Sequence, residues 1–304
     1  MKPYLQLLAI VACLTFLSCQ KEISWDIIPS TGGGGTGGGS TGGGNTDGDL
    51  LVKAVAITEG TTDTNVVTLT WDANKKLTQY KSTGRTNGFD ASAQYDIIRH
   101  SNGNIQKINS KPFAPFGGFA VDSIVTYTYY QSTSNKLQYA ITTTYTSIMD
   151  KKDSVVLTYN AAGYVTTKKV YSESIITGSM DLQIEETYTY DANGNLTHSS
   201  TSMADPLTGV LSAAGTTTMS YNTHKGPSRL GEEAFLILSV ENVSPNYTNT
   251  KIQSGTSGGG GTSIPITATL SNTLYNSFDR PIKGTITTTP TPPGYKIHYT
   301  YYYQ

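Results

Sequence analysis

Residues 190–196 read Tyr-Asp-Ala-Asn-Gly-Asn-Leu: an aromatic residue, an acidic turn residue, an Asn-Gly pair and an aliphatic residue. Asn-Gly supplies the positive φ angles that a tight hairpin turn needs. The Asp191 side chain can cap the turn backbone, and the aromatic ring can pack across from Leu196 on the returning strand. This stretch therefore predicts a β-hairpin.

The same order of residue types recurs along the chain as a degenerate repeat. Its copies cover residues 71–77, 159–165, 190–196 and, more loosely, 275–282. Asn102-Gly103-Asn104 is a further turn signal of this kind. Each copy predicts one hairpin, so the chain is expected to fold as a series of them.

Between the turns, apolar and polar residues alternate with the period of two that is typical of strands. Residues 125–129 read Val-Thr-Tyr-Thr-Tyr, which places the valine and both tyrosines on one face and both threonines on the other. Residues 155–159 and 297–303 repeat the scheme, and no long stretch has a convincing helical period. The predicted fold is an all-β domain over residues 50–304. We expect a large curved antiparallel sheet of consecutive hairpins, a meander that is either a half-barrel or barrel-like.

Composition excludes one class of partner. The 304 residues carry a net charge of -1 and only 14% charged residues, so there is no basic surface for nucleic acid. The aromatic residues are mostly tyrosines, with 21 Tyr against 7 Phe and 2 Trp. Tyr favours half-exposed strands, which fits the predicted sheet.

The N-terminus has the pattern of a secretory signal peptide over residues 1–18. Lys2 precedes an apolar run over residues 5–17, and polar residues follow Cys19 directly. The run is shorter than the roughly 20 apolar residues that a membrane-spanning helix needs, so we expect it to be cleaved.

Phe16-Leu17-Ser18-Cys19 resembles the lipobox of bacterial lipoproteins, with Phe16 in place of the usual aliphatic residue. The looser lipoboxes of Bacteroidota lipoproteins tolerate this change. The resemblance implies that Cys19 is diacylated and becomes the mature N-terminus. Cys13 would be removed with the signal peptide, leaving no disulfide framework. The alternative is an ordinary secretory peptide with an incidental cysteine.

Residues 19–49 predict a flexible tether, because Gly, Thr and Ser dominate from Ser30 to Gly48. About twenty such residues have a root-mean-square reach of roughly 25 Å. Lys21-Glu22 resembles part of the charged signal that sends Bacteroidota lipoproteins to the cell surface. The predicted location is the outer membrane, with the cell surface favoured over the periplasmic face.

Residues 190–196 also resemble the YD repeat of Rhs-type proteins. Together with residues 221–227 and 241–244, the run of hairpins resembles Bacteroidota lipoproteins of a family of unknown function with a porin-like fold. This resemblance implies a curved antiparallel sheet, but no activity and no functional residues. An integral membrane pore is disfavoured, because faces lined by Thr and Ser lack the apolar band of a transmembrane barrel.

No catalytic or metal-binding residues are predicted. Glu185 and Glu186 should point to opposite faces of a strand, and Glu232-Glu233 is interpreted as a solvated pair in a loop. The four histidines lie far apart in sequence, which gives a zinc site no support. Residues 191–195 match the opening of a calcium loop, but the rest of that loop is missing, so the hairpin is the better interpretation.

Two serines are candidates for O-glycosylation. Asp122-Ser123-Ile124 and Asp153-Ser154-Val155 resemble the short acceptor motif of Bacteroidota, which would be modified after export. A motif of three residues also occurs by chance. Ser123 and Ser154 are the only modification sites predicted besides Cys19.

The predicted function is that of a lipid-anchored envelope protein with a structural or protein-interaction role and no enzymatic activity or cofactor. The predicted contacts are the membrane, through the lipid on Cys19, and a glycan or an envelope protein. One alternative is binding of a glycan or another ligand through exposed tyrosines, which would gather on one concave face. A second alternative is an enzyme whose residues meet only in the folded chain.

Overall fold

A computed structural model of the chain describes residues 48–304, except for residues 87–88, 112–120, 147–149, 175–176, 206, 229, 238–242, 258–260, 263–264 and 290–295. The predicted signal peptide, Cys19 and most of the tether lie outside the described residues. The described residues are almost entirely strands. These are β1 (Leu51–Thr58), β2 (Thr64–Trp71), β3 (Leu77–Thr86), β4 (Phe89–Arg99), β5 (Ile105–Lys111), β6 (Val121–Tyr130), β7 (Leu137–Thr146), β8 (Lys151–Tyr159), β9 (Val165–Glu173), β10 (Met180–Tyr190), β11 (Leu196–Ala204), β12 (Leu211–Lys225), β13 (Asn246–Ser257), β14 (Gly261–Thr262), β15 (Ile266–Tyr275), β16 (Pro281–Thr289) and β17 (Lys296–Tyr303).

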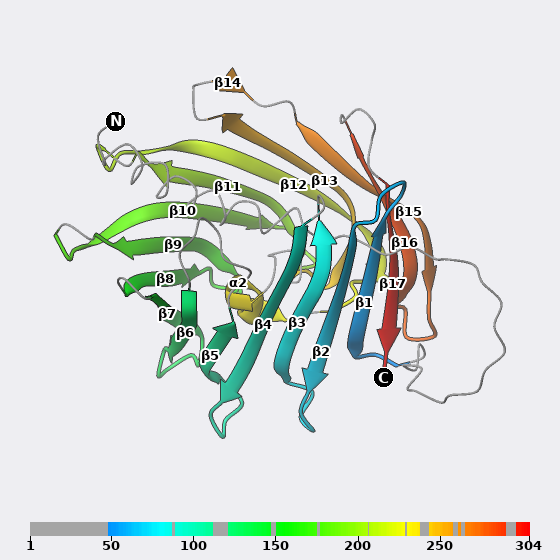
Figure 1. Cartoon of the computed structure of the whole chain (residues 1–304), viewed down its shortest axis with the longest axis horizontal. Coiled ribbons are helices and arrows are strands. Elements are labelled where there is room, and N and C mark those ends of the chain that lie inside the picture. Colours follow the sequence, from blue (N-terminus) through cyan, green and yellow to red (C-terminus); the bar gives the residue numbers. More distant parts are fainter. Residues whose placement is uncertain are drawn as a thin grey trace.

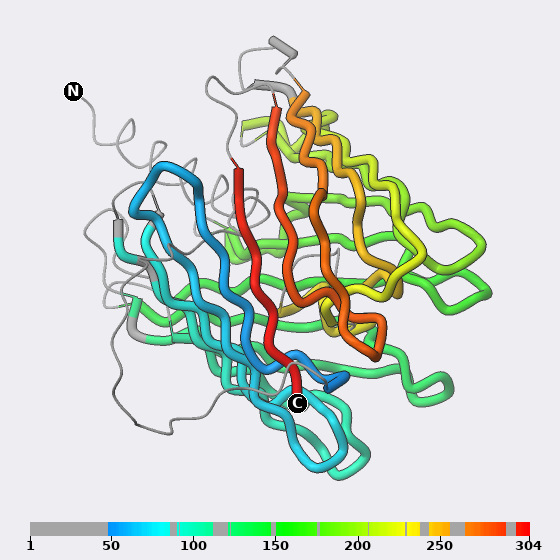
Figure 2. Tube along the Cα trace, turned by 90° about the vertical axis from the view of Figure 1, so that its right-hand side faces the viewer, coloured from blue at the N-terminus to red at the C-terminus, as the bar shows by residue number. Residues whose placement is uncertain are grey.

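The strands form one closed antiparallel barrel. Each long strand pairs with the next along the chain, and β13 pairs with β15 as well as with the two-residue β14. The barrel closes because β17 pairs with β1, with Ala54 opposite Tyr301 and Ala56 opposite Tyr299. Figure 2 shows the first and last strands side by side. Sixteen strands make the barrel wall. The predicted meander of hairpins is therefore confirmed, and of the half-barrel and the barrel-like sheet the chain forms the closed barrel.

The repeat turns lie together at one end of the barrel. In the 190–196 hairpin, the Gly194 amide donates to the Asp191 carbonyl over 3.1 Å, and the Asp191 amide donates to the Asn195 carbonyl over 2.9 Å. Of the turn residues only Gly194 has a positive φ, 82°. The two-residue turn that Asn-Gly favours needs a positive φ at both residues, so this hairpin has a three-residue loop instead. A Cβ at Gly194 would also lie 2.5 Å from the Tyr164 hydroxyl oxygen.

The capping and pairing expected of the repeat are confirmed. Asp191 Oδ1 accepts hydrogen bonds from the amides of Asn193 and Asn195, both over 2.9 Å. In the register, Tyr190 lies opposite Leu196, and a strand irregularity precedes this pair. Two other copies have the same pairing, Trp71 with Leu77 and Tyr159 with Val165, whereas in the looser fourth copy Tyr275 lies opposite Pro281, one residue before the aliphatic Ile282.

A ring of hydrogen bonds joins neighbouring hairpins at this end. Tyr159 donates its hydroxyl proton to the Leu137 carbonyl over 2.6 Å, and Tyr221 donates to the Leu196 carbonyl over 2.7 Å. Each bond links the end of one strand to the start of the returning strand of the preceding hairpin. We call the side chains that make these bonds the latch ring: Trp71, Arg99, Tyr130, Tyr159, Tyr221 and Tyr303.

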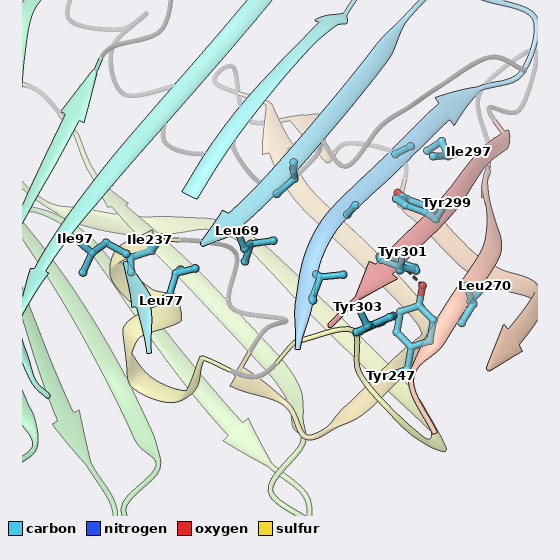
Figure 3. Packing of buried hydrophobic residues seen from close by; sticks show 14 of the residues in the cluster. Leu69, Leu77, Ile97, Ile237, Tyr247, Leu270, Ile297, Tyr299, Tyr301 and Tyr303 are labelled. Carbon is cyan, nitrogen blue, oxygen red and sulfur yellow. Dashed lines mark hydrogen bonds between the residues drawn. The ribbon is translucent and has the colours of Figure 1, made fainter. Parts of the chain in front are cut away.

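A short helical segment lies inside the barrel, near the latch ring. It consists of η1 (Gly231–Glu233) and α2 (Ala234–Ile237), which lie between β12 and β13 in the sequence, and we call it the plug. Ile237 packs in a cluster with residues from β1 to β5 and β17, whereas Phe235 packs in a second cluster with residues from β7 to β12. Figures 1 and 3 show α2 within the barrel, with Ile237 close to Leu77 and Ile97. The plug therefore joins two opposite walls.

The alternation along the strands sorts side chains between the inside and outside of the barrel. In β17, Ile297, Tyr299, Tyr301 and Tyr303 are buried, and the residues between them are not. In β6 the alternation instead places polar residues inside the barrel and aromatic residues outside. Thr126 lies opposite Ile108 of the inner cluster and so faces inward, which leaves Tyr127 outward. The expected two faces of residues 125–129 are therefore confirmed, with the threonines on the inner one.

Candidate functional site

Three tyrosines are exposed on the outer face of the β6–β7 hairpin. Tyr127, Tyr129 and Tyr145 expose 44%, 40% and 37% of their surface, although the rings are large and apolar. The half-buried Tyr139 lies opposite Tyr129, and their rings stack with centroids 4.4 Å apart. We call these four residues the tyrosine strip. It follows the strand direction from Tyr139 to Tyr145, six residues or about 20 Å.

The strip has apolar residues within it and polar residues along its borders. Ile141 lies opposite Tyr127 and is half-buried. On the β5 side, Lys107 lies opposite Tyr127, and its Nζ is 5.5 Å from the centre of that ring. The expectation of exposed tyrosines on one face is thus met. The face is the outer, convex one rather than the concave one expected.

The candidate glycosylation serines lie on the same outer face. Ser123 is opposite Tyr145, and Ser154 is between Ile141 and Tyr171 of the two neighbouring strands. Both serines are half-buried. Their modification stays a prediction.

The plug is attached to both walls by its two carboxylates. Glu233 accepts two hydrogen bonds from Arg99, over 2.7 and 2.8 Å, and the side chains of this pair are only 7% (Arg99) and 16% (Glu233) exposed. Glu232 accepts from the Tyr159 hydroxyl over 2.9 Å and from the Leu137 amide over 3.2 Å. The prediction of a solvated pair at Glu232-Glu233 is therefore wrong. The neighbouring sequence does not reveal these contacts, because the side-chain partners Tyr159 and Arg99 lie 73 and 134 residues away.

The hydroxyl groups of Tyr130 and Tyr159, beside the plug, remain protonated at ordinary pH. Burial, with the carboxylates of Glu233 and Glu232, raises the pKa of Tyr130 to about 12. Burial and the Glu232 carboxylate also raise the pKa of Tyr159 well above its usual value. Both hydroxyl groups belong to the latch ring, so the raised pKa values accompany a structural role of these tyrosines.

Glu185 and Glu186 point to opposite faces, as predicted. Glu185 faces Lys169 on the outside, with oxygen and nitrogen 3.5 Å apart. Glu186 faces Lys168 on the inside over 2.8 Å and also accepts from the Tyr188 hydroxyl. Neither carboxylate is placed to form a catalytic pair with the other.

An open groove of about 660 Å³ lies beside the 190–196 hairpin. Its amide side chains are used within the fold: Asn195 donates to Asp191 Oδ2, and Asn222 donates to the Tyr275 hydroxyl. Burial alone would raise the pKa of Asp191, but hydrogen bonds from Asn195, Asn193 and Gly194 outweigh it and lower that pKa. Asp191 therefore acts as a turn cap, as the hairpin interpretation predicted.

One histidine and one carboxylate form a pair at the same end. His224 Nδ1 is 2.6 Å from Asp279 Oδ1, and the His224 ring stacks on Tyr275 with centroids 3.8 Å apart. The hydrogen bond from His224 holds the pKa of Asp279 below its usual value. The pair joins the end of β12 to the β15–β16 turn.

The start of the described chain is also held at the plugged end. Asn276 Nδ2 donates to the Gly48 carbonyl over 2.9 Å, and Arg280 Nε donates to Asp49 Oδ1 over 2.8 Å. Leu50 and Gln304 exchange backbone hydrogen bonds of 3.2 and 2.9 Å. Gly48 and Asp49, at the end of the predicted tether, therefore lie at the end of the barrel that carries the repeat turns.

No three His, Cys, Asp or Glu side chains among the described residues come close enough together to hold a metal ion. The described part of the chain has no helix with the length and apolar character that a bilayer span requires.

Comparison with known proteins gives structural similarity only. No family model and no curated protein matches the chain. It is similar to the crystal structure of a porin-like protein from Bacteroides vulgatus, with a TM-score of 0.48, 12% identity, and coverage of 84% of this chain and 99% of that one. A porin-like protein from Bacteroides uniformis gives a TM-score of 0.46 and 9% identity over 83% and 97% of the two chains.

A third similar structure is TcdB2-TccC3 without its hypervariable C-terminal region. The match has a TM-score of 0.24 and 12% identity, and it covers 77% of this chain but 12% of that one. At these identities and TM-scores the similarities establish neither a family nor an activity for this chain.

Proposed function

We propose that this chain is a lipid-anchored, non-enzymatic protein of the outer membrane that displays its barrel for binding. Acyl chains on Cys19 would hold it, and several chains at about 0.8 kcal/mol per buried CH₂ make such attachment effectively permanent. The signal peptide pattern, the lipobox-like Phe16-Leu17-Ser18-Cys19 and the glycine-rich tether support this proposal.

The observation that carries the display role is the position of the tether. Arg280 and Asn276 fix Asp49 and Gly48 at the plugged end. Burial alone would raise the pKa of Asp49, but the Arg280 guanidinium outweighs it and lowers that pKa, so the pair is ionised at neutral pH. A barrel attached by this end presents its outer wall and its other rim to the surroundings.

The non-enzymatic part of the proposal rests on the titratable groups inside the barrel. Arg99 with Glu233 and Lys168 with Glu186 are paired across the wall or to the plug. Such pairs hold structure together without leaving a carboxylate poised for proton transfer. An enzyme would instead have clustered acids or bases in a cleft.

Anchoring is tested in the native host with Cys19→Ala, and with Cys13→Ala as the matched control. We expect the wild type and Cys13→Ala in the membrane fraction with covalent lipid, and Cys19→Ala without lipid and released or retained as precursor. A wild-type protein without lipid would overturn the proposal. Digestion of the wild type by an impermeant protease on intact cells would place it on the surface, the orientation that we favour.

The two candidate glycosylation sites are tested by intact mass. We propose that Ser123 and Ser154 carry O-glycans after export, since both lie on the outer wall. The protein from the native host should exceed its lipidated mass by glycan increments, and Ser123→Ala with Ser154→Ala should remove them. An unmodified mass would contradict this part of the proposal.

A further inference from the structure

The tyrosine strip has a composition that the barrel itself does not require. Inside the barrel, Tyr299, Tyr301 and Tyr303 are buried in the core, and their rings contribute to its stability. On the outside, Tyr127, Tyr129 and Tyr145 leave more than a third of their surface in water. Other strands carry Thr and Ser on the outer wall, as β12 does with Thr216, Thr218 and Ser220. Exposed aromatic residues that gather on one hairpin call for a ligand.

The hydrogen-bonding groups of the strip point to a polar ligand. Among the described residues, no hydrogen bond engages the hydroxyl groups of Tyr127, Tyr129 or Tyr145. Each of these residues thus offers an apolar ring face together with a hydroxyl group. A pyranose ring has the complementary surface, with C–H groups on its face and hydroxyl groups around its edge.

Two charges near the strip are already paired, and the charge that borders it directly, on Lys107, lies against the Tyr127 ring with its Nζ 5.5 Å from the ring centre, so none of the three requires a charged ligand. Lys169 lies 3.5 Å from Glu185 on the outer wall. Asp96 accepts hydrogen bonds from Gln79 and Gln94 over 2.7 and 3.0 Å. A lipid phase would have to remove water from these groups, which is costly, whereas a sugar supplies hydroxyl groups in place of that water.

The shape of the strip selects an extended chain rather than a single sugar. The four rings follow two adjacent straight strands for about 20 Å with no concave pocket around them. A single sugar would contact only one or two rings on such an open wall. A polysaccharide can contact all of them at once, and each ring then adds to the affinity.

We propose that the tyrosine strip binds a neutral, extended polysaccharide, with Tyr127 and Tyr145 as the stacking residues at its middle and far end. This inference deepens the proposed binding role and does not depend on the lipid anchor, so the two can fail separately.

The test is affinity electrophoresis of the full chain in native gels containing hydroxyethyl cellulose, glucomannan, β-mannan, xylan or laminarin. The detergent must have a polyoxyethylene rather than a sugar headgroup. We compare the wild type with Tyr127→Ala combined with Tyr145→Ala. Loss of two stacking rings should weaken the binding of the combined variant by about fivefold or more.

Tyr302→Ala is the matched control. Tyr302 lies on the outer wall of β17, six strands away, and Lys53 Nζ is 5.5 Å from the centre of its ring, just as Lys107 Nζ is from Tyr127. It should bind like the wild type. Tyr127→Phe combined with Tyr145→Phe should retain most of the affinity, because stacking is kept. Urea unfolding of all variants checks that the barrel is intact.

Three results would overturn the inference. One is that none of the five polysaccharides retards the wild type. The second is that the strip variant and Tyr302→Ala lose affinity equally. The third is that the Cys19→Ala chain binds vesicles of phosphatidylcholine and phosphatidylglycerol and loses this binding when Tyr127 and Tyr145 are also replaced by Ala. That result would mean that the strip contacts a lipid surface. Loss of anchoring with retained polysaccharide binding would overturn only the proposed function.

Discussion

Tyr129 and Tyr130 are neighbours in β6, yet they belong to two regions with different roles. Tyr129 faces out, stacks on Tyr139 and is 40% exposed. Tyr130 faces in, and its hydroxyl oxygen accepts a hydrogen bond from the Ile105 amide over 3.1 Å. The same residue type thus serves the latch ring on one face of the strand and the tyrosine strip on the other. Strand parity, rather than residue type, decides whether a tyrosine stabilises this barrel.

The largest difference between the two regions is expected for core truncation. Leu196 is fully buried at the plugged end, so Leu196→Ala should lower the free energy of unfolding by about 3–5 kcal/mol. Tyr127→Ala in the strip should cost about 1 kcal/mol or less, although it removes a larger side chain. Urea unfolding followed by tryptophan fluorescence measures both. Equal losses would remove the distinction between the regions.

The ion pairs should separate in the same way. Glu233→Ala leaves Arg99 without its partner inside the barrel, and we expect a loss of about 2–4 kcal/mol. Glu185→Ala removes an outer-wall partner of Lys169 and should cost about 0.5 kcal/mol. The same unfolding experiment applies. A Glu233→Ala variant as stable as Glu185→Ala would mean that the plug is not attached as described.

Two inward tyrosines sharpen the role of the latch ring. Tyr159→Phe removes the hydrogen bonds to Leu137 and Glu232 and should cost about 1–3 kcal/mol. The Tyr190 hydroxyl is buried and has no hydrogen-bond partner among the described residues, so Tyr190→Phe should be neutral or slightly stabilising. If the two substitutions had the same effect, the latch bonds would contribute nothing of their own.

The smallest effect concerns pH. The pKa of Asp191 is lower in the folded chain than in the unfolded chain, so its contribution to stability is present above pH 3.8 and is lost as the pH falls through the folded value. A carboxyl NMR titration should give a midpoint below 3.8. Asp191→Asn should keep the turn, as Asn160 and Asn276 do, and remove this acid-dependent part. A midpoint at or above 3.8 would contradict the capping geometry.

The local parts of the fold were predictable, because local residues determine them. The caps at Asp72, Asn160 and Asp191 follow from the order of residues within seven positions, and so does the pairing of the aromatic residue with the next aliphatic one in these three copies. Alternation likewise predicted which residues of β6 and β17 share a face. It could not show that the threonines of β6 face inward, because that depends on the pairing of Thr126 with the buried Ile108 of the neighbouring strand.

Closure and the plug were beyond local patterns for the same reason. The pairing of Val55 with Thr300 joins residues at opposite ends of the domain, and the sequence of neither strand shows which strand it pairs with. The plug has seven residues in η1 and α2, too few for a helical period to appear. Glu232 and Glu233 therefore resembled an ordinary acidic loop. The candidate strip was foreseen only as exposed tyrosines, without its residues or its face.

The most direct test of this account is a disulfide across the closing strands. Val55→Cys with Thr300→Cys places two thiols on outward residues that are directly opposite each other, at a spacing that a disulfide can bridge. We predict nearly complete cross-linking under mild oxidation, and none for Val55→Cys with Thr218→Cys, which lies on β12. If the thiols at 55 and 300 were to remain reduced while the barrel is folded, the sheet would be open, and the account of a closed, plugged barrel would be wrong.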